Sequence, residues 1–196
     1  GSIEQNVDIV STGDLTTNAE KIDGNIANAG TLELTGGENN NTITGTGTTE
    51  ISGDVTNSDS ITQEKISIAS TGTLNTNAGN ISADIENAGL LNLIGGENNN
   101  TITGAGINQI SGDVTNKAAM SNAKIMTGGI LNIGADAVLE DSVVDNGGKV
   151  NITSSATAER TEVNDAGVLH VASGGTANDT TVNSGGKLET EISAKL

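Results

Sequence analysis

The chain has no phenylalanine, tyrosine, tryptophan, proline or cysteine in its 196 residues, whereas glycine occurs 27 times. Aromatic side chains usually supply much of the buried surface of a globular core, about 150–250 Å² each. Their absence leaves isoleucine, valine, leucine and alanine to fill the interior, which favours a thin, regular core over one large irregular core. The absence of cysteine excludes disulfide bonds and thiolate metal sites.

Basic residues are scarce as well, because 8 Lys and Arg stand against 25 Asp and Glu, for a net charge of −17. Nucleic-acid binding needs a basic surface, so the charge argues against it, and also against adsorption to anionic membranes. No apolar run approaches the roughly 20 residues of a membrane span, so we expect no membrane insertion by this fragment. Gly1–Ser2 resembles a cloning scar and no signal peptide follows it, which indicates a piece of a larger protein.

A long internal repeat is the strongest signal in the sequence. Residues 9–57 align without gaps on residues 68–116, a shift of 59, and 33 of these 49 positions are identical. The string GGENNNTITG at 36–45 returns unchanged at 95–104. Low hydrophobicity and high charge are also typical of disordered chains, but such regular spacing opposes that alternative.

The second half has a shorter repeat, with a constant shift of 19. Small-residue pairs begin at Gly128, Gly147, Ala166 and Gly185, and two residues after each pair's second member lies an apolar residue: Leu131, Val150, Leu169 or Leu188. In the first half, single glycines precede an equivalent Leu or Val with spacings of 17, 23 and 19. We interpret these spacings as coils of one solenoid whose loops lengthen and shorten.

Each coil has apolar residues at every second position, which is the period of a half-buried strand and not of a helix. One coil cannot bury its inner face alone, but a stack of coils can. We therefore predict an all-β, single-stranded parallel β-helix, right-handed, with about ten coils of 17–23 residues. Its 59-residue units cover residues 3–124 and its 19-residue repeats residues 125–196, in one continuous solenoid. An antiparallel β-sandwich is the alternative, but it does not require gapless repeats.

Glycine is expected at the corners, where the backbone has positive φ or where a Cβ has no room. Asparagine tolerates the same backbone and forms hydrogen-bonded ladders between coils. We assign this corner role to Asn28, Asn57, Asn87, Asn116, Asn164 and Asn183. The inward column is predicted to contain Leu15, Leu32, Leu74, Leu91, Leu131, Val150, Leu169 and Leu188.

The string VASGGTANDTTVNSGG at 171–186, with weaker copies in 125–162, resembles the repeat of self-associating autotransporter passengers. This family contains the diffuse-adherence adhesin and the phase-variable aggregation antigen of Gram-negative bacteria. The resemblance covers residues 125–196 and implies a right-handed β-helix that is secreted across the outer membrane and mediates adhesion or cell–cell aggregation. The lack of aromatic residues departs from the family pattern.

No residue pattern indicates catalysis, a cofactor or a metal site. Right-handed β-helices include polysaccharide lyases, whose sites cluster carboxylates with a basic residue, but this chain has one Arg and one His. We place His170 on the outside of a strand, and Arg160, between Glu159 and Glu162, as a surface ion-pair partner. The loop at 36–44 resembles the calcium-binding nonapeptide G-G-x-G-x-D-x-U-x, but Asn41 replaces the Asp ligand. Instead, we predict a polar interface at Asn39, Asn40, Asn41, Asn98, Asn99 and Asn100.

The sequence thus predicts a non-enzymatic passenger fragment of a secreted surface adhesin, located at the Gram-negative cell surface. Its polar faces are expected to bind another copy or a host surface ligand. A passive stalk that projects another domain is the first alternative, and a polysaccharide-acting β-helix enzyme is the second. Ser and Thr along the ridges are also candidates for O-linked sugars.

Overall fold

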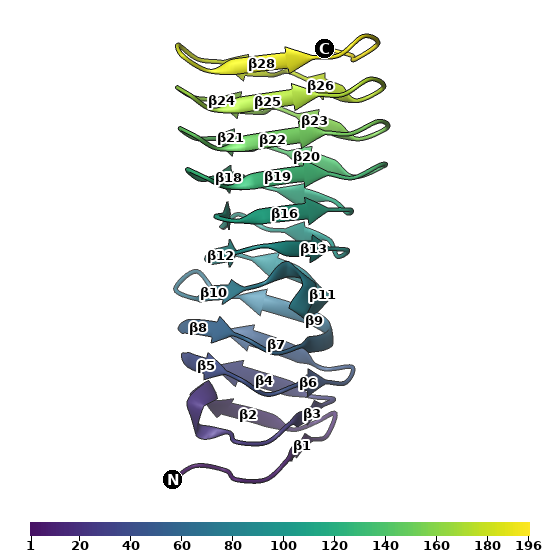
Figure 1. The fold of residues 1–196 in the computed structure, drawn as a ribbon. Helices are drawn as coiled ribbons and strands as arrows, with labels where there is room; N and C mark the ends of the chain where they lie inside the picture. Colours follow the sequence, from purple (N-terminus) through teal and green to yellow (C-terminus); the bar gives the residue numbers. More distant parts are fainter.

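The computed structural model describes residues 1–196 as a rod of stacked coils, with the N-terminus at one end and the C-terminus at the other (Figure 1). Every strand pairing is parallel and joins one coil to the next. In Figure 1 the chain crosses the front of the rod from left to right, returns behind, and rises toward the C-terminus, which is the path of a right-handed coil. The predicted parallel β-solenoid is therefore confirmed.

Each coil has three sides, which we call faces I, II and III in the order in which the chain visits them. Face I contains β1 (Val7–Ile9), β3 (Ile26–Asn28), β6 (Ile43–Thr44), β13 (Gly96–Asn98), β16 (Asp113–Asn116), β19 (Ile130–Ile133), β22 (Lys149–Ile152), β25 (Val168–Val171) and β28 (Lys187–Thr190). Face II contains β2 (Asp14–Thr17), β4 (Thr31–Leu34), β7 (Thr48–Ile51), β14 (Ile102–Thr103), β17 (Met120–Ser121), β20 (Val138–Glu140), β23 (Thr157–Glu159) and β26 (Thr176–Asn178). Face III contains β5 (Gly37–Asn39), β8 (Asp54–Asn57), β10 (Thr73–Thr76), β12 (Leu90–Leu93), β15 (Ile107–Ile110), β18 (Ala123–Ile125), β21 (Val143–Val144), β24 (Glu162–Val163) and β27 (Thr181–Val182).

Two longer strands, β9 (Ile61–Ile68) and β11 (Ile81–Asn87), run around the corner from face I to face II, and their pairing shifts register between Ser82 and Asp84. Two short 3-10 turns, η1 (Ala19–Lys21) and η2 (Ala78–Asn80), are capped by the side chains of Asn18 and Asn77. No helix of the protein has the length and apolar character needed to cross a membrane.

Face II keeps an unbroken register through ten coils. Its inward column is Leu15, Leu32, Thr49, Ile66, Ile85, Ile102, Met120, Leu139, Ala158 and Ala177. From each member of the column to the next, the residue number rises by between 17 and 19, which is the length of one coil. The column replaces Ile and Leu by Ala toward the C-terminus, where the interior is filled by the larger residues of the other two faces.

The 59-residue repeat does not return to the face on which it began. Leu15 and Leu32 lie on face II, whereas their repeat equivalents Leu74 and Leu91 lie on face III. Val55 lies on face III, and its equivalent Val114 lies on face I. Each unit therefore takes three coils and one further face.

This rotation corrects one part of the sequence interpretation. The spacing of 23 between Gly30 and Gly53 is not a long coil, because Gly30 precedes a strand of face II and Gly53 precedes a strand of face III. The 23 residues therefore make up one full coil and the additional residues that carry the chain from face II to face III. From Gly112 onward the glycines stay on face I, and their spacing settles to the regular coil length.

The glycines separate into the two physical classes expected of them. The second member of each glycine pair has no room for a side chain, since a Cβ at Gly129 would lie 2.3 Å from the carbonyl oxygen of Ile110. The first member has positive φ, +80° at Gly128 and +73° at Gly147, and Ala166 adopts the same conformation with φ +55°. Two more corner columns have positive φ mostly without glycine: Asn122, Asp141, Arg160 and Asp179 in one, and Asp136, Ser155, Gly174 and Ser193 in the other.

The six asparagines predicted at such corners are not among the residues with positive φ. Four of them, Asn28, Asn57, Asn87 and Asn116, are buried and belong to the interior. Their side chains bind backbone groups at the bends instead of relieving backbone strain. The other two, Asn164 and Asn183, form the predicted ladder, because Asn183 donates to Asn164 and Asn164 donates to Asp145. The predicted inward Leu and Val residues are fully buried, except Leu15 and Leu188 near the two ends, which are half-buried.

Candidate functional site

The two copies of the GGENNNT loop are built around one buried asparagine each. Asn39 and Asn98 are both 2% exposed. The Asn98 amide nitrogen donates to Oδ1 of Asn116 in the next coil at 2.6 Å and to the carbonyl of Asn100 at 2.7 Å. Asn39 makes the same contacts to Asn57 and to the carbonyl of Asn41. These two residues of the predicted polar interface therefore face the interior, where they fix the loop.

The third asparagine of each loop also points back to the rod. Nδ2 of Asn41 donates to the carbonyl of Ile22 at 2.7 Å, and Nδ2 of Asn100 donates to that of Ile81 at 2.9 Å. Only the middle residues, Asn40 and Asn99, are exposed. Of the predicted interface, they are the side chains that a partner can reach fully, and a binding role for the loops stays a prediction.

The two loops differ in their surroundings although their sequences are identical. Asn40 and Asn41 border a shallow cavity of about 190 Å³ whose other polar members are Glu20, Asp23 and Glu38. In the second loop the acidic Glu20 and Asp23 correspond to Gly79 and Ser82. In addition, Nζ of Lys117 pairs with Glu97 at 2.6 Å and lowers the pKa of that carboxyl. The first loop is therefore the more acidic of the two, because one of the carboxylates beside the second loop is paired with a lysine.

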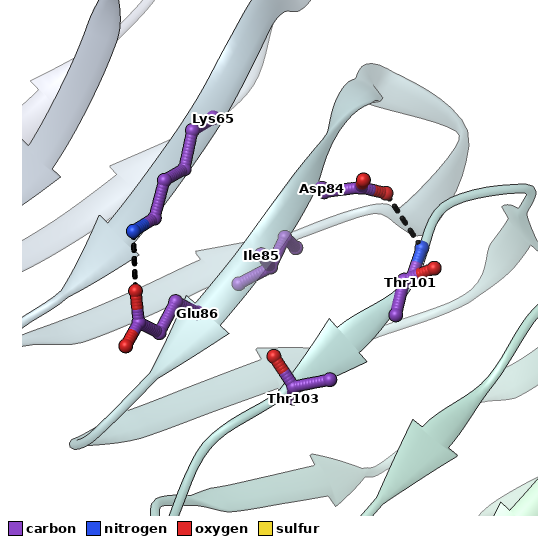
Figure 2. Close-up of a pocket in the computed structure, with 6 residues that line it drawn as sticks. All are labelled: Lys65, Asp84, Ile85, Glu86, Thr101 and Thr103. Carbon is purple, nitrogen blue, oxygen red and sulfur yellow. Dashed lines mark hydrogen bonds and ion pairs between the residues drawn. The ribbon is translucent and has the colours of Figure 1, made fainter.

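A second concave site lies where β9, β11 and β14 adjoin at the corner between faces I and II (Figure 2). It is a shallow cavity of about 220 Å³ lined by Lys65, Asp84, Ile85, Glu86, Thr101 and Thr103. Figure 2 shows Lys65 paired with Glu86, an interaction that lowers the pKa of the Glu86 carboxyl, while Oδ1 of Asp84 accepts from the backbone N–H of Thr101 at 2.9 Å. Sequence reasoning missed this site, because its residues come from three coils.

Outward-facing amides form ladders along two faces. On face III, Asn75 donates to Asp54 at 3.0 Å and Asn92 donates to Asn75 at 3.3 Å. On face I, Asn132 donates to Asp113 at 2.8 Å and Asn151 donates to Asn132 at 2.7 Å. Each ladder starts on an Asp carboxylate, and these two Asp residues are repeat equivalents. The predicted side-chain ladders thus exist on the outside as well as inside.

The two candidate catalytic residues considered from sequence are both on the surface. His170 occupies the outward position that Asn151 and Glu189 occupy in the coils beside it, and its Nε2 lies 3.6 Å from Glu191. Arg160 is bidentate to Asp141 of the preceding coil, with distances of 2.6 and 3.1 Å, and it also contacts Glu159 at 3.2 Å.

These contacts raise the pKa of the Arg160 guanidinium and lower that of the Asp141 carboxyl. The main partner of Arg160 is thus one coil away and not adjacent in sequence. No group of three or more His, Cys, Asp or Glu side chains converges in a geometry that holds a metal ion. All the groups whose pKa is shifted lie at the surface, either exposed or half-buried, and their partners are surface charges or hydroxyls.

Comparisons with known proteins are sparse. No protein-family model matches the sequence, and no curated protein matches it. Among solved structures, the crystal structure of a TibC-catalysed hyper-glycosylated fragment of TibA is similar, with a TM-score of 0.48 and 16% sequence identity. The match covers 98% of this chain and 77% of that chain. Neither the TM-score nor the sequence identity is high enough to support a transfer of function to this chain.

Proposed function

We propose that this rod is a passenger fragment of a secreted bacterial surface adhesin, located at the Gram-negative cell surface and without enzymatic activity. It makes contact between cells, or between a cell and a host surface, through its polar sheet faces. The observation that carries the proposal is the pair of amide ladders on faces I and III, which leave hydrogen-bonding groups along the rod axis. The autotransporter-like repeat at 171–186 supports the same assignment.

The strength of such a contact follows from the number of bonds. One hydrogen bond between two proteins contributes only about 0.5–1.5 kcal/mol net, because both groups give up bonds to water. A single pair of rods therefore associates weakly. Many rods on facing cells hold together, since each bond after the first forms at high effective concentration.

The net charge of the rod determines how cell clumping depends on salt. Two rods of net charge −17 repel each other until salt screens their charges. Cell clumping should therefore strengthen as salt rises from about 10 mM to about 150 mM, the reverse of an interface held by opposite charges.

The experiment displays the full-length passenger on cells and measures clumping across this salt range. The variant Asn132→Ala/Asn151→Ala removes the face I ladder, and Thr157→Ala/Thr176→Ala, on outward positions of face II, is the matched control. We expect the ladder variant to clump less at every salt concentration and the control to behave as the parent. If the parent never clumps and retains no host glycan or matrix protein, the rod is a passive stalk.

A further inference from the structure

The sequence contains five Asn-x-Ser/Thr triplets, the pattern that N-linked glycosylation requires. They begin at Asn40, Asn80, Asn99, Asn151 and Asn178. A transferase that modifies a folded chain has to reach two groups of the triplet, the amide nitrogen of Asn and the hydroxyl of Ser or Thr. The structure separates the five triplets by this criterion.

Three triplets fail it. Nδ2 of Asn80 is occupied by a hydrogen bond to the carbonyl of Ser58 at 3.2 Å. Asn151 lies within β22 and donates to Asn132, and the hydroxyl of its partner Thr153 donates to the carbonyl of Ile133 at 2.7 Å. Asn178 is exposed, but the hydroxyl oxygen of Thr180 is buried.

Two triplets meet it, and they are the two copies of the same loop. Asn40 and Asn99 are exposed, lie between strands, and donate no hydrogen bond to the backbone or to another coil. The Asn99 side chain contacts only the exposed carboxylate of Glu97 in its own loop, where water can take its place. Thr42 is only half-buried, and its hydroxyl donates a long hydrogen bond of 3.4 Å to the exposed carboxylate of Asp59, not to the backbone. Figure 2 shows Thr101 on the lining of the surface cavity at the β11–β14 corner.

The neighbouring asparagines explain why this loop is a good acceptor. Asn39 and Asn41 are tied to adjacent coils through Asn57 and Ile22, so the loop is held in place while its middle residue projects. The same anchoring holds in the second copy. An acceptor held in this way loses little conformational entropy when a transferase binds it.

We propose that Asn40 and Asn99 are acceptor sites for an N-linked sugar supplied as a nucleoside diphosphate hexose. The amide nitrogen forms a bond to the anomeric carbon, and the bond between that carbon and the diphosphate oxygen breaks. The nucleoside diphosphate leaves with the electron pair of that bond, and one amide proton is released. Each modification adds a neutral, bulky, hydrated group to a corner of the rod.

The test incubates the purified folded rod with a soluble asparagine N-glucosyltransferase and UDP-glucose, followed by intact mass measurement and peptide mapping. The rod unfolded in urea and then diluted into the same reaction serves as the comparison. We expect two hexoses on the folded rod, at Asn40 and Asn99, and additional hexoses on Asn80 or Asn151 in the unfolded chain. Thr42→Val should remove the hexose from Asn40 and leave that on Asn99, whereas Thr44→Val, the matched control, should leave both.

Two results would overturn the proposal. One is a folded rod that stays unmodified while its unfolded form accepts hexoses at the same loops. The other is equal modification of Asn80 or Asn151 in the folded rod, since their amides donate hydrogen bonds to groups of the neighbouring coil. Peptide mapping of the protein recovered from its native cells tests the modification in place, and unmodified Asn40 and Asn99 there also refute it. Cell clumping is a separate readout, so the adhesin proposal can fail without affecting this result.

Discussion

Replacing Asn98 by Ala should loosen one loop of the rod while leaving its core intact. Three groups lose their partner: Oδ1 of Asn116, and the carbonyl and the amide of Asn100. A polar group left unpaired inside a protein costs about 1–3 kcal/mol. Asn100 is half-buried, so water can replace its two lost bonds, whereas Asn116 is fully buried. We therefore expect a loss of about 3 kcal/mol, equivalent to about a hundredfold change in a local opening equilibrium.

Hydrogen exchange is the suitable assay, because each coil of a solenoid contacts only its neighbours and the effect should stay local. Amides of residues 96–104 should exchange about a hundredfold faster in Asn98→Ala, and those of distant coils should not change. Asn99→Ala is the matched control, since its exposed side chain should change stability by less than about 0.5 kcal/mol. Equal effects from the two variants would refute the buried capping role of Asn98.

Three further outcomes can be measured. Leu131→Asp places an unpaired carboxylate in a fully buried position between Val114 and Val150. Denaturant unfolding should therefore show that the free energy of unfolding falls by at least about 3 kcal/mol. A mutant that melts like the parent would contradict the inward column. Ala166→Gly should stabilise the rod by roughly 1 kcal/mol, because glycine adopts the positive φ of this position without the steric strain of a Cβ. Gly167→Ala should lower Tm, because the added Cβ would lie 2.5 Å from the Val144 carbonyl oxygen. The hydroxyls of Ser52 and Thr16 hold the pKa of the Glu33 carboxyl below its ordinary value of 4.5. The stability that these two hydrogen bonds contribute is present above pH 4.5 and is lost as the pH falls through the lowered pKa. Ser52→Ala should raise the Glu33 pKa toward 4.5 in an NMR titration, and an unchanged midpoint would contradict this assignment.

Much of the fold was predictable, because period-two apolar residues and tight-corner glycines are local signals. The inward residues Leu131, Val150 and Leu169 follow from alternation alone. The step of one face per 59-residue unit was not predictable in this way. A repeated string specifies the same strand, loop and strand wherever it occurs, but the face on which it falls depends on the summed length of all the coils before it.

The candidate site shows a signal that was available and not used. Asn39 and Asn41 lie four and two residues before the buried Ile43, so a period of two places them on the inward side of the chain, whereas Asn40 falls on the outward side. Alternation thus separates the capping asparagines from the projecting one within a single loop. The cavity at Lys65 and Glu86 had no comparable signal, since it arises where two long strands bend around a corner.

The step of one face per unit has a geometric consequence for any longer array of such units. With a rise of about 4.8 Å per coil, successive GGENNNT loops are roughly 16 Å apart along the axis and point to different sides. A loop would return to its first side only after three units, at roughly 48 Å. The loops of such an array would therefore follow a helical path around the rod. A rod lying on any of its three sides would present some loops to the surface beneath it and others to its neighbours.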